Sequence, residues 1–253
     1  SSDVCSSDLL IQGITEFIPV SSSSHLILFS NYSNFEEQSL LVDVSLHIGS
    51  FLAVLCYFYK DILDFVKNKI LFLKILISSI PVMLIGFFLV ETNLIENLRN
   101  IKVIAWTTLI FGILLYFGDK CDLSKNIESN FSFKSAIFIG AFQILSLIPG
   151  VSRSGITLTA ARILNFNRFD SAKISFLLSL PTLGAVSIFG LNNTLSSNDI
   201  NFSLINILCI FLSFLFSILS IKYFLHFVKK FSLNIFVIYR VLLGLILLFL
   251  SYL

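Results

Sequence analysis

Charged residues are scarce in this sequence. Asp, Glu, Lys and Arg make up 13% of its 253 residues, whereas hydrophobic residues make up 56%. Soluble domains carry about 25% charged residues, so this composition excludes a water-soluble globular enzyme. The hydrophobic content and the 28 phenylalanines also exclude a disordered chain. The formal net charge of +2 is too small to indicate a nucleic-acid partner, so lipid is the environment that the chain requires.

Cysteine and methionine are also rare. The four cysteines do not indicate a disulfide framework, and Cys56 and Cys209 lie within apolar runs, where a small buried side chain is the simpler interpretation. Met83 is the only methionine, and the first residue is serine. We therefore interpret residues 1–8 as a non-native remnant and expect a single membrane-embedded domain over residues 9–253.

Long apolar runs fill most of the chain. A bilayer crossing needs about 20 apolar residues of helix, and most of the runs have a length near one crossing. They cover residues 9–30, 44–59, 70–90, 103–118, 135–165, 174–191, 203–221 and 235–252. The sequence therefore predicts an all-α, polytopic integral membrane protein with about six full spans.

Two of these runs are interrupted in the middle. Pro19 and four consecutive serines break the run 9–30, and Pro149 with the glycines and serines after it breaks the run 135–165. Each half of the second run is about 15 residues, or about 22 Å of helix, which is too short for a hydrocarbon core of about 30 Å. Broken helices are tolerated in membranes only where protein or water covers the freed backbone groups. We therefore expect two re-entrant helix hairpins in addition to the full spans.

The distribution of Lys and Arg among the connections predicts the topology. Three lie in each of the connections 60–69, 119–134 and 222–234, and none lies in 31–43 or 192–201. The positive-inside rule places the first group in the cytoplasm and the second outside. The run 135–165 therefore has to enter and leave on the cytoplasmic side. Three basic residues just beyond it are expected to contact lipid headgroups, namely Arg162, Arg168 and Lys173.

The two interrupted runs also resemble each other. EFIPVSSSSH (16–25) aligns without gaps with SLIPGVSRSG (146–155) at an offset of 130 residues. Three spans separate the copies, so the second copy is expected to be inverted relative to the first, as in many transporters. We place repeat 1 at about 9–118 and repeat 2 at about 135–252, with the two breaks facing each other and forming the site.

One charged side chain occurs at each break. Glu16 and Arg153 both lie within apolar runs, where an ionisable residue is a functional hypothesis by default. Arg153 needs a counter-charge, which Glu16 could supply and a phosphate could supply better, through two parallel hydrogen bonds. The glycines and serines around Arg153 indicate a loop that opens a helix, whose free N–H groups would face an anion. The simpler alternatives are an interfacial glutamate and a serine-capped kink.

Ser22 and His25 lie within one helical turn of each other. Together with the Glu16 carboxylate, they match the pattern of an activated nucleophile. A histidine that is merely satisfied in the core is the alternative. Gln12 precedes Glu16 by four residues and so projects from the same helix face.

These residues resemble two signatures of the bacterial undecaprenyl-pyrophosphate phosphatase family, of the bacitracin-resistance type. The first is Gln/Glu-x-x-x-Glu leading into a Pro, a serine-rich turn and a His, and here it runs from Gln12 to His25. The second is Pro-Gly-x-Ser-Arg-Ser-Gly-x-Thr, which residues 149–157 match at every position. The order of spans agrees from about residue 9 to the end of the chain. Ser24 is a departure, since the family usually has Gly there.

The resemblance implies hydrolysis of undecaprenyl pyrophosphate to undecaprenyl phosphate, which recycles the lipid carrier of peptidoglycan synthesis and confers bacitracin resistance. It implies a divalent cation, Mg²⁺ or Ca²⁺, and a site reached from the outer face of the bacterial cytoplasmic (inner) membrane. Membrane lipids are the other expected partners. Whether the chain also forms a homodimer is left open by the resemblance.

Residue roles also follow from the resemblance, position by position. The catalytic residues would be Glu16, Ser22, His25 and Arg153. The residues that bind the substrate phosphates would be Gln12, Ser21, Ser23, Ser152, Ser154, Gly155 and Thr157. Glu16 and Gln12 would hold the metal. Whether Ser22 attacks the substrate or positions a water activated through Glu16 stays open.

Three other interpretations compete with a phosphatase of this family. Inverted repeats favour alternating access, so a transporter or flippase of polyprenyl phosphate is the main alternative. An ion-coupled solute transporter would need polar residues at the middle of the other spans, which are nearly devoid of them. The other superfamily of membrane lipid phosphatases has His six residues after its Ser-Arg pair, where this sequence has Thr159 instead.

Overall fold

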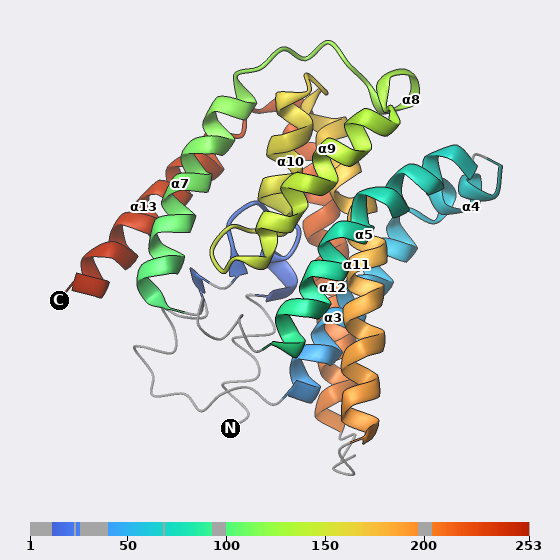
Figure 1. Ribbon diagram of the computed structural model, residues 1–253, viewed down its shortest axis with the longest axis vertical. Coiled ribbons are helices and arrows are strands. Elements are labelled where there is room, and N and C mark those ends of the chain that lie inside the picture. Colours follow the sequence, from blue (N-terminus) through green and yellow to red (C-terminus); the bar gives the residue numbers. More distant parts are fainter. Residues whose placement is uncertain are drawn as a thin grey trace.

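A computed structural model describes residues 12–22, 24–25, 40–67, 69–92, 100–196 and 204–252. Within these ranges the chain forms helices and no strand, and Lys125 and Phe166 make an isolated bridge (Figure 1). Its elements are α3 (Leu40–Tyr57), α4 (Tyr59–Lys67), α5 (Lys69–Glu91), α7 (Ile101–Asp119), α8 (Ile127–Asn130), α9 (Phe133–Ile144), η1 (Leu145–Leu147), α10 (Arg153–Ile163), α11 (Arg168–Ser196), α12 (Leu204–Lys230) and α13 (Asn234–Tyr252). The prediction of an all-α fold is confirmed.

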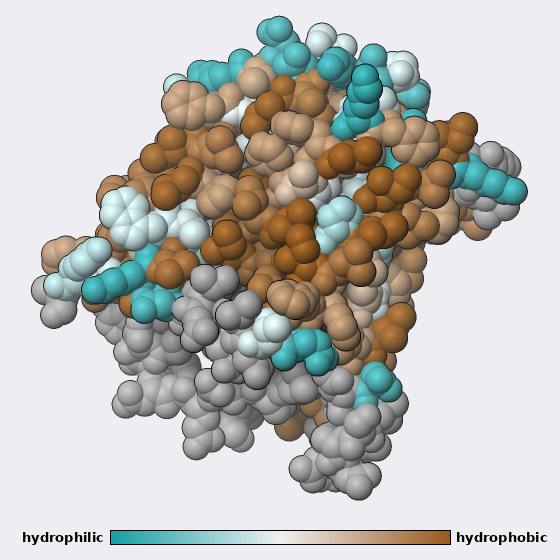
Figure 2. Space-filling view, viewed as in Figure 1, coloured by the Kyte–Doolittle hydropathy of each residue, from teal (hydrophilic) through white to brown (hydrophobic). Residues whose placement is uncertain are grey.

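Five of these helices are long and apolar enough to cross a membrane, namely α5, α7, α11, α12 and α13. They carry many exposed large hydrophobic side chains, and on the face seen in Figure 2 hydrophobic residues cover much of the middle of the molecule. Exposed apolar surface on this scale is expected only where lipid surrounds the protein. A polytopic membrane protein is therefore confirmed. The number of six full spans stays a prediction, because α3 has only 18 residues.

The helices extend beyond the predicted apolar runs. α11 begins at Arg168 instead of residue 174, and α12 continues to Lys230 instead of ending at residue 221. Hydropathy detects only the apolar part of a helix, whereas the backbone hydrogen bonds continue through polar residues at its ends. Long basic side chains there can reach water while their stems stay on the helix.

The second interrupted run folds back on itself, while its re-entrant placement in a bilayer stays a prediction. α9 and η1 run inward, a loop follows at residues 148–152, and α10 returns to the starting end (Figure 1). At that end, the Lys125 N–H donates to the Asn165 carbonyl at 3.0 Å, and the Asn167 N–H donates to the Lys125 carbonyl at 2.9 Å. Both ends of the hairpin are therefore held at one end of the bundle.

Arg162 corrects one expectation, because it is fully buried and does not face lipid headgroups. Its guanidinium donates to the carbonyls of Asp119 at 3.1 Å and Asp122 at 3.0 Å, and also to those of Cys121 and Phe166. Arg168 makes a two-point ion pair with the Asp119 carboxylate, at 2.6 and 3.0 Å. Arg162 therefore fastens α10 to the end of α7 and the segment after it, where backbone carbonyls need a donor, and Arg168 fastens the start of α11 to α7.

Two helix pairs run antiparallel across the bundle. Val44, early in α3, contacts Gly190, late in α11. Leu109 and Gly112 of α7 contact Gly244 and Arg240 of α13, respectively. The hairpin α9–α10 packs among α5, α7 and α11. This arrangement brings the loop of the hairpin to the middle of the bundle, beside residues 12–22.

Candidate active site

A small cavity forms where the two broken segments meet. It has a volume of about 150 Å³, and residues from both breaks line it. The lining residues are Thr15, Glu16, Ser21, Ser22, Ser146, Ile148, Gly150, Ser152 and Arg153. The two breaks therefore face each other, and their hydroxyl and charged groups converge in one place.

An ion pair joins the two breaks across this cavity. The Arg153 Nη2 donates to Glu16 Oε1 at 2.8 Å, although the two residues are 137 positions apart in the sequence. Both side chains are only slightly exposed, at 14% and 13%. The Arg153 Nη1 is buried and has no hydrogen-bond partner in the described part of the chain. One arm of the guanidinium is thus compensated by Glu16, and the other keeps unused hydrogen-bonding capacity.

Both breaks contain a serine in a backbone conformation that side chains rarely adopt. Ser21 has φ +70° and Ser152 has φ +67°. Such strain persists only where the surroundings impose it, and it clusters at functional sites. Ser152 also caps α10, because its Oγ accepts the Gly155 N–H at 3.2 Å. The positive end of the α10 dipole therefore lies at the cavity, where it favours negative charge.

Side chains from α7 and α13 hold the second loop in place. Thr107 Oγ1 donates to the Pro149 carbonyl at 2.6 Å. The Arg240 Nη2 donates to the carbonyls of Gly150 and Val151, each at 3.0 Å. Gly150 has φ +91°, and a side chain there would collide with Thr107. The loop that precedes Arg153 is therefore fixed by donors from two helices outside the hairpin.

His25 is bound away from the cavity. Its Nδ1 is hydrogen bonded to the Ser21 carbonyl at 2.7 Å, and its Nε2 is hydrogen bonded to the Tyr239 hydroxyl at 2.5 Å. The two rings are stacked, with centroids 5.6 Å apart. No hydrogen bond joins His25 to Ser22 among the described residues. In this conformation His25 orients the first loop against α13.

The remaining predicted residues lie around the cavity without lining it. Ser154 donates to the Ile18 carbonyl at 3.1 Å, and so ties the two breaks together. Thr157 is buried, with its hydroxyl 2.7 Å from that of Ser175.

Gly155 lies against Arg240, and Gln12 is buried one turn before Glu16. Ser23 lies outside the described residues.

Sequence reasoning missed the polar groups that α7 and α13 contribute. Thr107, Thr108 and Arg240 lie inside apolar runs, and Arg240 is fully buried. The view that the other spans are nearly devoid of polar residues was therefore wrong. An arginine in the middle of an apolar run is itself a signal of a functional position, and it could have identified Arg240.

Replacing Arg240 with methionine is expected to lower the turnover number by about 10²-fold, because the loop that positions Arg153 loses two hydrogen bonds from a buried guanidinium. Unsatisfied carbonyls also cost about 1–3 kcal/mol each, so the melting temperature should fall as well. Turnover and thermal unfolding of the purified variant measure the two effects. Arg240→Lys retains the charge without the two-armed group and should recover only part of the activity. Wild-type turnover in Arg240→Met would refute this positioning role.

Comparison with known proteins decides the family. A family model described as "Bacitracin resistance protein BacA" matches residues 9–246. The chain belongs to the BacA family. It is 49% identical to the undecaprenyl-diphosphatase of Pelagibacter ubique over 245 residues, which cover 96% of this chain and 95% of the relative. It is also 40% identical to that of Roseobacter denitrificans and 38% identical to that of Jannaschia sp., each over 96% of both chains.

The match to the BacA family extends over every element that builds the cavity. It includes both broken segments, α7 and the part of α13 that carries Arg240. The resemblance inferred from two short motifs is thus confirmed over almost the whole chain.

Proposed function

We propose that this chain hydrolyses undecaprenyl pyrophosphate to undecaprenyl phosphate and inorganic phosphate. The observation that carries the proposal is the Glu16–Arg153 pair in a serine-lined cavity among apolar helices. A pyrophosphate on a hydrocarbon chain needs a polar, basic site at membrane depth, and this cavity has those features. The relatives named undecaprenyl-diphosphatase support the same reaction, and they do not favour a flippase.

Phosphate binding follows from the donors in the cavity. The free Nη1 of Arg153 and the N-terminus of α10 would bind the terminal phosphoryl group, together with the hydroxyls of Ser152 and Ser22. Phosphoryl transfer is accelerated mainly by positioning and by stabilising charge on the phosphoryl oxygens. Donors fixed by other helices provide this stabilisation without reorganising during the reaction.

The chemical step is an in-line displacement at the terminal phosphorus. In one route, Ser22 Oγ forms the new P–O bond, the bridging P–O bond breaks, and undecaprenyl phosphate leaves with the bond electrons. Water then hydrolyses the phosphoserine. In the other route, water attacks directly and Ser22 positions it. In both, Glu16 is the better placed proton acceptor, because it lines the cavity with Ser22, whereas both ring nitrogens of His25 are engaged elsewhere.

A divalent cation fits this cavity only if the substrate supplies some of its ligands. The described residues contain no group of three or more His, Cys, Asp or Glu side chains that could hold a metal ion. Mg²⁺, however, is often bound by one or two carboxylates together with substrate phosphates. Glu16 would provide the carboxylate, while Gln12 does not line the cavity. When bound, the cation would neutralise charge on the pyrophosphate.

Removal of divalent cations is therefore expected to lower phosphate release by about 10²-fold or more, because pyrophosphate charge would remain uncompensated. The measurement is phosphate release after treatment with EDTA, and a parallel sample with excess Mg²⁺ or Ca²⁺ serves as the control. Full activity in the presence of EDTA would show that Arg153 and the α10 N-terminus suffice.

We also propose an inverted-repeat topology, with the cavity open to the outer face of the bacterial inner membrane. The antiparallel pairs α3–α11 and α7–α13 support this topology, since each pair contains helices at corresponding positions of the two repeats. The lysine-rich connections support the orientation through the positive-inside rule.

Hydrolysis is tested with the purified protein and undecaprenyl pyrophosphate in detergent. We expect one phosphate to be released for each lipid molecule, with undecaprenyl phosphate as the second product. Lipid moved between the leaflets of a proteoliposome without any phosphate release would instead favour the flippase.

A further inference from the structure

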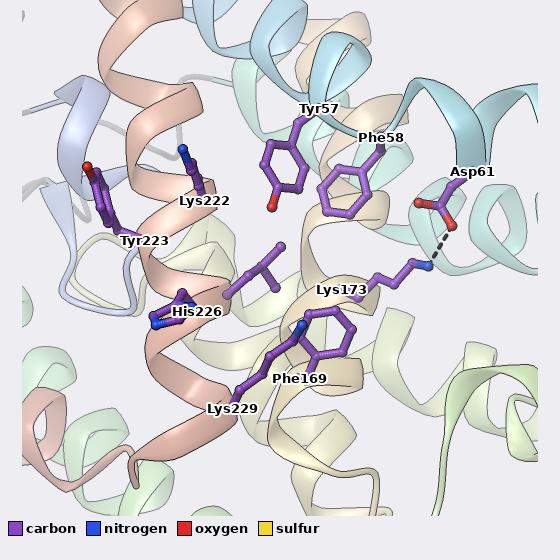
Figure 3. Close-up of a pocket in the computed structure, with 10 residues that line it drawn as sticks. Tyr57, Phe58, Asp61, Phe169, Lys173, Lys222, Tyr223, His226 and Lys229 are labelled. Atoms are coloured by element: carbon purple, nitrogen blue, oxygen red, sulfur yellow. Dashed lines mark ion pairs between the residues drawn. The ribbon is translucent and has the colours of Figure 1, made fainter.

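A second and larger cavity lies at another part of the bundle (Figure 3). It has a volume of about 470 Å³ and forms where α3, α4, α11 and α12 meet. Its lining residues are Tyr57, Phe58, Asp61, Phe169, Lys173, Lys222, Tyr223, Leu225, His226 and Lys229. None of them lines the cavity of Glu16 and Arg153, so this is a separate site. Its volume falls within the range of about 300–1,000 Å³ that is typical of ligand sites.

Positive charge is in excess in this second cavity. Asp61 is the one carboxylate among its lining residues, and it is already paired with Lys173 at 2.5 Å. Lys222 and Lys229 form no ion pair with any residue that the structure describes. Lys229 instead lies over the ring of Phe169, 4.3 Å from its centroid. In Figure 3 the Lys173 ammonium points at Asp61 and the Lys229 side chain reaches across to Phe169. An anion would therefore find two uncompensated lysines here.

The wall of this cavity is apolar. Phe58 and Leu225 are buried there, each 3% exposed, and Tyr57 directs its hydroxyl into the pocket in Figure 3. A site with a basic rim, a tyrosine hydroxyl and an apolar wall suits an amphiphile better than a small hydrated ion. The ligand should therefore carry both a phosphate and a hydrocarbon part.

One face of α12 carries basic residues at the end that lines the cavity and apolar residues toward its other end. Lys222, His226 and Lys229 follow one another at helical spacing, and the same face carries exposed apolar residues toward the other end. These apolar residues are Leu208, Phe211, Leu215 and Leu219. From residue 208 to residue 222 the helix rises about 21 Å, which exceeds the half-thickness of about 15 Å of a hydrocarbon core. A lipid chain could lie along this face while its headgroup occupies the basic end.

We propose that this cavity binds the phosphate headgroup of an anionic membrane lipid, whose hydrocarbon chain lies along the apolar face of α12. Basic pockets between transmembrane helices are known to hold anionic headgroups. Lys222 and Lys229 bind the phosphate, and Tyr57 adds a hydroxyl. This site is independent of the hydrolytic reaction, because no residue of the first cavity takes part in it.

The test compares binding of phosphatidylglycerol, phosphatidylcholine and inorganic phosphate to the purified protein. We expect native mass spectrometry to detect bound phosphatidylglycerol, and the melting temperature to rise with this lipid alone. The double variant K222Q/K229Q should bind it roughly 30-fold more weakly, because two lysines near the headgroup are lost. The control K102Q/K120Q has the same change of charge at exposed lysines that lie over the rings of Tyr252 and Tyr116. Its binding should equal that of the wild type.

Several results would overturn this proposal. They are equal binding of phosphatidylcholine, equal stabilisation by inorganic phosphate alone, and an equal loss of binding in the control variant. A second measurement needs no variant: phosphatidylglycerol should protect Lys222 and Lys229 of the wild-type protein from amine acetylation, while Lys120 stays reactive. Unchanged labelling of Lys222 and Lys229 would also refute the site.

Discussion

Replacing Arg153 with alanine is expected to lower phosphate release from undecaprenyl pyrophosphate by about 10³-fold or more. The variant loses the guanidinium that lines the cavity, and Glu16 loses the partner that compensates its charge. The effect should appear mainly in the turnover number, because stabilisation of the phosphoryl oxygens is greatest in the transition state. Steady-state kinetics of the purified variant measure it.

A matched substitution separates charge from geometry at this position. Arg153→Lys retains the positive charge, but it cannot bind Glu16 and a phosphate through separate arms of one planar group. We expect it to stay far below the wild type. Both variants should retain the wild-type elution volume in gel filtration, since the loop is also held by Thr107 and Arg240. Near-normal turnover in folded Arg153→Ala would remove this residue from the site.

Replacing Ser22 with alanine should abolish measurable turnover if Ser22 is the nucleophile, because no other atom can then form the phosphoserine. A loss of only about 10²-fold would indicate instead that Ser22 positions the attacking water. Acid quenching during turnover, followed by mass spectrometry, should find a phosphoryl group on Ser22 in the first case. Its absence, together with residual turnover, would favour direct attack by water.

Ser146 provides the matched control for this experiment. It is a serine that lines the same cavity from the 3₁₀ helix η1, opposite the first loop. Ser146→Ala removes one hydroxyl from the cavity without affecting the first break. We expect it to retain most of the wild-type turnover, so a specific loss in Ser22→Ala would not reflect a general change of cavity polarity. An equal loss in both variants would contradict a special role for Ser22.

Much of this site could be predicted from the sequence because lipid constrains the chain so strongly. A bilayer allows few charges and few breaks in its helices, so Glu16, Arg153 and the two interruptions stand out against apolar surroundings. The hairpin followed from the length of its two halves and from the lysines of the neighbouring connections. The structure folds α9 and α10 back on each other and brings Glu16 and Arg153 to within 2.8 Å.

Other parts of the site could not be predicted from local pattern. The contacts of Tyr239 with His25 and of Arg240 with Gly150 depend on how α13 packs beside α7. Neither residue lies near a break in the sequence. Arg162 was expected at the lipid headgroups, because the positive-inside rule counts charge and does not detect backbone carbonyls that need a donor. The partner of a buried arginine is set by tertiary contacts.

The sequence by itself determined the environment, the broken helices and the residues at the breaks. Each of these follows from the cost of placing charge or unpaired backbone in hydrocarbon, and this cost is readable residue by residue. Tertiary structure alone decided which side chains line the cavity. Ser22 and Ser152 do, whereas His25 and Thr157 turn to Tyr239 and Ser175. The direction of a side chain depends on its neighbours from distant segments, and no local pattern encodes those neighbours.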